Sequence, residues 1–304
     1  MENNINPLLC DPETGLCELP GASNTLAAHA PQEVADKVKI IYFTDPICSS
    51  CWGIEPQLRQ LELEYGHAIE FDIRMGGLLP DWSYNSGGIS KPSDVAHHWD
   101  EVSQHYDMPI DGDIWLEDPL DSSYPPSIAV KAAQFQDPKK AVVFLRKMRE
   151  FLFLEKKNIT RWEHLAAAAV YAGLDEQKLK LDYTGRARES FQKDLQLAAQ
   201  LGVRGFPTMI FVGSNQRQTI IRGSQPYRVY EDAVMALGVG TVKKEYDRSV
   251  DGLFAEYPTQ TVREFAELSG NTRVEALILL RTLVESGELA ESQSKNGPLY
   301  HVEF

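Results

Sequence analysis

Two cysteines separated by two serines, at positions 48–51, constrain the fold of this chain more than any other feature of its sequence. A β-branched and aromatic run at 38–44 precedes them and predicts a buried strand. Apolar residues at helical spacing follow them, and Gly66 ends the predicted helix. Two cysteines at a helix N-terminus can close a small-ring disulfide, and the helix dipole favours a thiolate there. We therefore predict Cys48 as an exposed nucleophile and Cys51 as the thiol that resolves the mixed disulfide.

The segments around this motif predict an α/β fold. Residues 68–74 alternate in polarity as a second strand, so strand, helix and strand form a βαβ unit with parallel pairing. A pattern typical of strands occurs again within 208–222, before a predicted last helix of this domain at 227–237. Between these halves, at about 92–202, the pattern is helical, in pieces separated by Gly and Pro. We predict one domain at 37–238, in which a helical block interrupts a small sheet.

The two ends of the chain have different compositions. Residues 1–36 contain few apolar runs and several prolines and glycines, which predicts an irregular arm. Residues 241–304 follow a glycine-containing joint and predict two helices and then a short hairpin, the order of a winged-helix-like domain. This tail carries eleven acids and seven bases. A negative surface repels phosphate, so we predict a protein-contact or packing module here and no DNA-binding one.

Charge and cysteine content narrow the class of protein. The 304 residues include 44 acids and 30 bases, and the net charge of -14 argues against a nucleic-acid partner. Four cysteines are too few for a disulfide-stapled secreted scaffold. The sequence has neither the pattern of a secretory signal nor a run of about 18 apolar residues. We therefore expect a cytoplasmic protein without a membrane partner.

A second motif, Gly202-Val203-Arg204-Gly205-Phe206-Pro207-Thr208, lies directly before a predicted strand. A proline at the head of a strand that faces a CxxC pair suits a cis peptide bond, which exposes backbone to a substrate. Together with the string 45–53 and the helical block, this motif resembles the thioredoxin superfamily. More narrowly, the chain resembles the DsbA-like thiol–disulfide oxidoreductases of the FrnE type. The predicted fold is thus a thioredoxin fold with a DsbA-like helical insertion, followed by the winged-helix-like domain.

This resemblance implies a site and an activity. Pro207 would be the cis proline, and Phe206, Thr208 and Trp52 would contact the substrate. The implied activity is dithiol–disulfide exchange on protein or small-molecule disulfides, as an oxidoreductase or isomerase that needs no cofactor and no metal. A Ser-Ser dipeptide replaces the Pro-His often found between DsbA cysteines, which favours a reductase or isomerase over a strong oxidant. From the sequence we prefer this enzymatic activity.

A narrower resemblance leads to a different function. The pattern Asp-Pro-x-Cys-x-x-Cys-Trp-x-x-Glu-Pro at 45–56, with the stretches 112–115 and 155–160, is similar to the SpxH family of adaptor proteins. Membership would imply an adaptor that presents an Spx-like client to the ClpXP protease, with the cysteines tuning or sensing redox state. That family has an amino-terminal Cys/His-rich segment, whereas this chain has Cys10, Cys17 and His29 there.

Two assignments stay open. Cys10 and Cys17 are either ordinary thiols in the arm, an accessory redox pair that relays to Cys48, or a metal clip. The same two cysteines could also complete a structural zinc site with Cys48 and Cys51. Asp45 is either a proton acceptor for the buried thiol or the former of an Asp-Pro turn.

Overall fold

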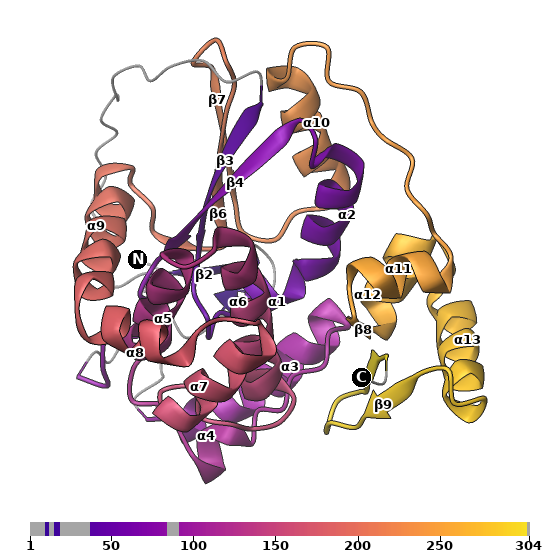
Figure 1. Cartoon of the computed structure of the whole chain (residues 1–304), viewed down its shortest axis with the longest axis horizontal. Helices are drawn as coiled ribbons and strands as arrows, with labels where there is room; N and C mark the ends of the chain where they lie inside the picture. Colours follow the sequence, from indigo (N-terminus) through magenta and orange to yellow (C-terminus); the bar gives the residue numbers. More distant parts are fainter. Residues whose placement is uncertain (1–9, 12–14, 19–36, 84–90, 303–304) are drawn as a thin grey trace, which may run out of the picture.

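The computed structural model describes residues 10–11, 15–18, 37–83 and 91–302 (Figure 1). Its centre is a four-stranded sheet of order β4-β3-β6-β7. Strand β3 pairs in parallel with β4 and antiparallel with β6, and β6 pairs antiparallel with β7. This sheet confirms the predicted α/β class and the thioredoxin fold. The strands are β3 Val38–Thr44, β4 Ile69–Met75, β6 Thr208–Val212 and β7 Gln218–Arg222.

The side chains of β3 divide between two hydrophobic cores because successive residues of a strand point to opposite faces. Ile40 and Tyr42 lie in the smaller core, which is covered by α2 and α10, and Phe43 lies in the larger core. Figure 1 shows α2 and α10 on one side of the sheet and α5, α6 and α9 on the other. The two helices of the smaller core are α2 Glu55–Tyr65 and α10 Tyr227–Leu237.

Seven helices occupy the block predicted at about 92–202, and they form the larger core with the sheet. Trp99 lies at its centre, with its ring 5.1 Å from that of Trp115 and 4.9 Å from that of Phe153. No described helix is long and apolar enough to cross a membrane. The helices are α3 Ser93–Tyr106, α4 Ile114–Glu117, α5 Tyr124–Gln134, α6 Pro138–Phe153, α7 Trp162–Tyr171, α8 Glu176–Thr184 and α9 Arg186–Gln200.

Two short strands lie within the segment that we predicted to be irregular. Strands β1 (Cys10–Asp11) and β2 (Leu16–Glu18) pair antiparallel, and β2 also pairs with β5 (Gly205–Phe206). The prediction of an irregular arm over 1–36 is therefore wrong at these residues. Strands of two or three residues leave no periodic pattern, and the second partner of β2, strand β5, lies far downstream in the sequence.

The tail of the chain forms a third hydrophobic core around a sheet of order β8-β10-β9. Helices α12 and α13 each begin with a capping box, in which a threonine and a glutamate three residues later bond each other's backbone N–H. The winged-helix assignment and the boundary at residue 241 stay predictions. The elements are α11 Val250–Glu256, β8 Thr259–Thr261, α12 Val262–Ser269, α13 Arg273–Glu285, β9 Ala290–Ser292 and β10 Leu299–His301.

Buried ion pairs join this tail to the thioredoxin fold. Glu264 of α12 is fully buried and accepts two hydrogen bonds from Arg146 of α6, at 2.6 and 3.1 Å. Arg59 of α2 lies 3.2 Å from the same carboxylate. Arg263 donates to the carbonyl oxygens of Gly53 at 2.9 Å and of Tyr106 at 2.6 Å. The tail is thus fixed directly against the helix that carries the CxxC motif.

Candidate active site

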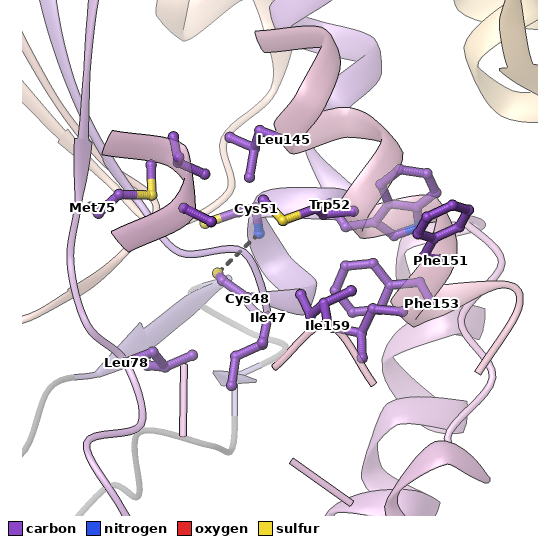
Figure 2. Packing of buried hydrophobic residues seen from close by; sticks show 14 of the residues in the cluster. Ile47, Cys48, Cys51, Trp52, Met75, Leu78, Leu145, Phe151, Phe153 and Ile159 are labelled. Atoms are coloured by element: carbon purple, nitrogen blue, oxygen red, sulfur yellow. Dashed lines mark hydrogen bonds between the residues drawn. The ribbon is translucent and has the colours of Figure 1, made fainter. Parts of the chain in front are cut away.

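The CxxC motif begins helix α1 (Ser49–Gly53), directly after the carboxyl end of β3. Cys48 is the N-cap residue, and its Sγ accepts a hydrogen bond of 3.1 Å from the backbone N–H of Cys51 (Figure 2). Both cysteines carry thiols, and both are 0% exposed. The prediction that Cys48 is exposed is therefore wrong for this conformation.

Burial and neighbouring charges set the protonation of the two thiols. Burial raises the pKa of Cys48, and the adjacent Cys51 sulfur raises it further. Burial also acts to raise the pKa of Cys51, but the hydrogen bond from Cys48 and the positive charge of Arg149 outweigh it and lower that pKa. In this arrangement the pKa of Cys48 is therefore raised and that of Cys51 lowered. This order is the reverse of the one that the helix dipole alone predicts.

Arg149 of α6 lies behind the cysteines and was missed by sequence reasoning. Its guanidinium donates to the Thr44 Oγ1 at 2.6 Å, to the Asp45 carbonyl oxygen at 3.2 Å and to Glu55 at 2.5 Å. The side chain is 1% exposed, although the sequence around 146–157 predicts a solvated charged face. Its partners lie 94 to 105 residues away in the sequence, so no local pattern identifies Arg149.

Asp45 is fully buried, and its carboxylate accepts three hydrogen bonds. The donors are the backbone N–H of Ile47 at 3.0 Å, that of Leu78 at 2.8 Å and the hydroxyl of Ser123 at 2.9 Å. Burial raises the pKa of Asp45 to about 6 against the opposing effect of these bonds. Since none of the three donors belongs to a cysteine, the contacts support its role as a turn former that joins three loops. A role as proton acceptor stays a prediction.

The raised pKa of Asp45 gives a testable dependence of stability on pH. The fold favours the protonated carboxyl, so the stability from this group is complete below pH 3.8 and is lost as pH rises through about 6. We expect urea unfolding from pH 4 to 7 to show the parent losing about 2 kcal/mol relative to Asp45→Asn. Asp81→Asn is the control, because serine hydrogen bonds lower the pKa of this exposed carboxyl. A stability difference between parent and Asp45→Asn that does not change with pH would contradict the assignment.

The second motif reaches the site from β5 and β6. The Phe206–Pro207 peptide bond is cis, and the backbone of Phe206 pairs with Cys17 of β2. Phe206 and Thr208 are buried, at 0% and 1% exposure, so the prediction that they contact substrate is wrong for this conformation. Thr208 pairs with Phe43, which places the second motif beside the strand that leads into the CxxC helix, and the edge of β5 is already paired.

Trp52 is a core residue, and the prediction that it contacts substrate is wrong. Its ring is 0% exposed and stacks on Phe153, with centroids 5.6 Å apart (Figure 2). Its Nε1–H donates to the Pro109 carbonyl oxygen at 3.0 Å, and the guanidinium of Arg146 lies 4.3 Å above the ring. Trp52 therefore ties the CxxC helix to the inserted helices instead of offering a surface.

A cavity of about 550 Å³ lies between the thioredoxin fold and the tail. Tyr106 lines it and donates from its hydroxyl to the Ser50 Oγ at 3.0 Å, which links the cavity to the dipeptide between the cysteines. Ser224, Arg263 and Arg273 line the cavity from the other elements. Its wall therefore combines residues of the thioredoxin fold and of the tail.

The side chains of Cys10 and Cys17 lie outside the described atoms, although their backbones pair in β1 and β2. Their assignment as a zinc site, a metal clip or a redox pair thus stays open at this point. Within the described part of the chain, no group of three or more His, Cys, Asp or Glu side chains could hold a metal ion.

A CxxC pair at the start of the first helix, with a cis proline at the head of a strand of the same sheet, defines a thioredoxin-fold protein. The sequence pattern of the family described as Thioredoxin matches residues 42–232. The ClpXP adapter protein SpxH of Halalkalibacterium halodurans is 37% identical over 76% of each chain. That of Shouchella clausii is 33% identical over 90% of each chain. The chain belongs to the thioredoxin family and, within it, to the SpxH family.

Solved structures share the fold at lower identity. A candidate protein disulfide isomerase from Nitrosomonas europaea has a TM-score of 0.57 at 22% identity, covering 66% of this chain and 97% of its own. The cytosolic disulfide reductase DsbM from Pseudomonas aeruginosa has a TM-score of 0.53 at 22% identity, covering 66% of this chain and 99% of its own. These similarities support the DsbA-like architecture and do not by themselves decide the activity.

Proposed function

We propose that this protein is an adapter that binds a protein client and presents it to the ClpXP protease. The observation that carries the proposal is the identity of 33–37% to ClpXP adapter proteins over 76–90% of the chain. The proposed client is an Spx-like protein, and the proposed location is the cytoplasm, where that protease acts. We thus place the adapter function first, whereas the sequence alone favours an enzyme.

The burial of both cysteines supports an adapter function over the enzymatic turnover of disulfides. A nucleophilic thiol must reach a disulfide in the substrate, but Cys48 is 0% exposed and its pKa is raised. An extended peptide that added to β5 would have to displace β2, which pairs with the same edge. Binding of a client at another surface needs neither change.

The joint between tail and thioredoxin fold supports the same function. The buried pairs of Glu264 with Arg146 and Arg59 hold the two parts together, and a cavity opens between them. Fixed relative positions of two parts present one continuous surface, which lowers the entropy lost on binding. The proposed client contacts this surface around the cavity.

The experiment that tests the proposal is reconstituted degradation of a purified Spx-like client by ClpXP. Adding the chain is expected to shorten the half-life of the client several-fold, because an adapter raises the local concentration of client at the protease. A degradation-resistant client that lacks its recognition segment serves as the control. An unchanged half-life, with a folded chain present in excess, would refute the adapter function.

Thiol–disulfide exchange is the second candidate function, and the complete set Cys48, Cys51 and Pro207 favours it. In this reaction Cys48 attacks the substrate disulfide and Cys51 resolves the mixed disulfide. Reduction of insulin by the parent chain, compared with Cys48→Ser, is the test. Equal rates for the two proteins would remove this candidate and leave the adapter function untouched.

A further inference from the structure

The described part of the amino-terminal segment lies against the backbone that precedes Pro207. In strand β2, Cys17 pairs with Phe206 and Glu18 pairs with Gly205, in antiparallel register. The chain thus supplies its own extended segment at the edge that borders the CxxC motif.

A second contact holds this segment in place. The carbonyl oxygen of Gly15 accepts a hydrogen bond of 3.0 Å from the backbone N–H of Ser224. Gly15 has a φ of +63°, and a Cβ at this position would lie 2.4 Å from that of Ser224, so only glycine fits the contact. The next residue back, Gly223, donates to the Pro207 carbonyl oxygen at 2.9 Å. Residues 15–17 are therefore fixed at two points on either side of the Phe206–Pro207 backbone.

The register also brings the two amino-terminal cysteines together. Cys10 and Cys17 are directly opposite each other in the antiparallel pairing of β1 and β2. Cα atoms of opposite residues lie about 4.5–5.5 Å apart in such a pair, within the range of about 4.4–6.8 Å that a disulfide requires. The backbone thus allows a Cys10–Cys17 disulfide without rearrangement of the hairpin.

We propose that Cys10 and Cys17 form a second redox pair, which exchanges its disulfide with the Cys48–Cys51 pair inside one molecule. Cys17 is the residue that attacks Cys48, because β2 lies between β1 and β5 and pairs with the backbone that precedes Pro207. That backbone leads into β6, whose Thr208 pairs with Phe43 near the end of β3, the strand before the CxxC motif. This inference does not depend on the adapter function, since it concerns only thiols of this chain.

The exchange consists of an oxidation followed by two thiol–disulfide exchanges. In the oxidation, Cys48 attacks a low-molecular-weight disulfide and releases one of its thiols, and Cys51 then attacks the Sγ of Cys48, releases the second thiol and closes the Cys48–Cys51 bond. The thiolate of Cys17 then attacks the Sγ of Cys48, so the Cys17–Cys48 bond forms, the Cys48–Cys51 bond breaks and Cys51 leaves as a thiolate that takes a proton. The thiolate of Cys10 next attacks the Sγ of Cys17, and Cys48 leaves and is protonated. The Cys48–Cys51 pair ends reduced, and the Cys10–Cys17 pair ends oxidised.

Matched two-cysteine variants of the full chain test the first contact. Cys10→Ser/Cys51→Ser leaves only Cys17 and Cys48, and Cys17→Ser/Cys51→Ser leaves only Cys10 and Cys48. After treatment with oxidised glutathione, acid quench and alkylation, peptide mass spectrometry measures the cross-link within monomers. We expect about tenfold more Cys17–Cys48 than Cys10–Cys48 cross-link, because the register gives Cys17 the higher effective concentration. Equal yields, or glutathione adducts without a Cys17–Cys48 cross-link, would overturn the proposal.

The parent chain tests the complete exchange without a change in the hairpin. Oxidised glutathione is expected to produce a Cys10–Cys17 disulfide about tenfold faster in the parent than in Cys48→Ser, since the variant lacks the thiol that carries the disulfide. Circular dichroism shows whether the variant is folded. Formation of the Cys10–Cys17 disulfide at the same rate in both proteins would overturn the relay. Neither readout involves a client or a protease, so failure here is distinguishable from failure of the adapter function.

Discussion

Replacement of Glu264 by alanine is expected to lower the free energy of unfolding by about 3–5 kcal/mol. This carboxylate is 0% exposed and lies between the guanidinium groups of Arg146 and Arg59. It also accepts the backbone N–H of Thr261 at 2.8 Å as part of the capping box of α12. Its removal leaves two buried cations without their shared partner, which costs more than the pair contributes when intact. Urea denaturation with linear extrapolation measures the loss.

The ionised Glu264 carboxylate contributes to the free energy of unfolding over a defined pH range. Burial acts to raise the pKa of Glu264, but the two arginines outweigh it and lower that pKa from 4.5 to about 2. A lowered pKa means that the stability is complete above pH 4.5 and is lost as pH falls through about 2. The effect of Glu264→Ala is therefore expected in full at neutral pH.

Arg273→Ala is the matched control for this prediction. Arg273 also joins the tail to the thioredoxin fold, through Asp107, but its side chain is 53% exposed. Surface ion pairs contribute about 0–1 kcal/mol, so the expected loss is below that of Glu264→Ala. Equal losses from the two substitutions would contradict the view that the buried pairs hold the tail in place.

Replacement of Gly76 by alanine is expected to cost about 1–3 kcal/mol by overpacking. Gly76 follows β4, and a Cβ at this position would lie 1.8 Å from the ring of Phe206. Phe206 is 0% exposed, so its ring has no room to move without shifting β5. The substitution therefore strains the strand edge that pairs with β2. Urea unfolding measures the cost.

A double-mutant cycle assigns this cost to the ring. In the background Phe206→Ala, the side chain that clashes is absent, and Gly76→Ala is expected to change stability by less than about 0.5 kcal/mol. A cost of Gly76→Ala that is the same in both backgrounds would place the strain elsewhere, in the backbone of residue 76.

Local patterns in the sequence were sufficient to predict the main sheet and its helices. The β-branched run of β3 and the helical spacing of the apolar residues in α2 can both be recognised within a few residues of sequence. The strands β1 and β2 could not be predicted in this way, because they are too short to show a pattern and because β2 pairs with the distant β5. Pairing between distant segments depends on the fold, which a short sequence window does not contain.

The candidate site was predicted in its chemistry but not in its environment. The positions of Cys48, Cys51 and Pro207 followed from motifs, since spacing alone identifies them. Burial of Cys48 and the charge of Arg149 did not follow, because both depend on which elements pack against α1. The burial of Trp52 could not be predicted for the same reason. An aromatic residue after a CxxC motif gives the same sequence pattern whether its ring lies in the core or on the surface.

The proposed adapter function requires binding of a client and no turnover of disulfides. The most direct measurement is the half-life of an Spx-like client with ClpXP under reducing conditions, with the parent chain or with Cys48→Ala/Cys51→Ala. We expect half-lives within about twofold of each other, because residues outside the binding surface contribute little to affinity. A variant that remains folded but no longer accelerates client degradation would contradict the claim.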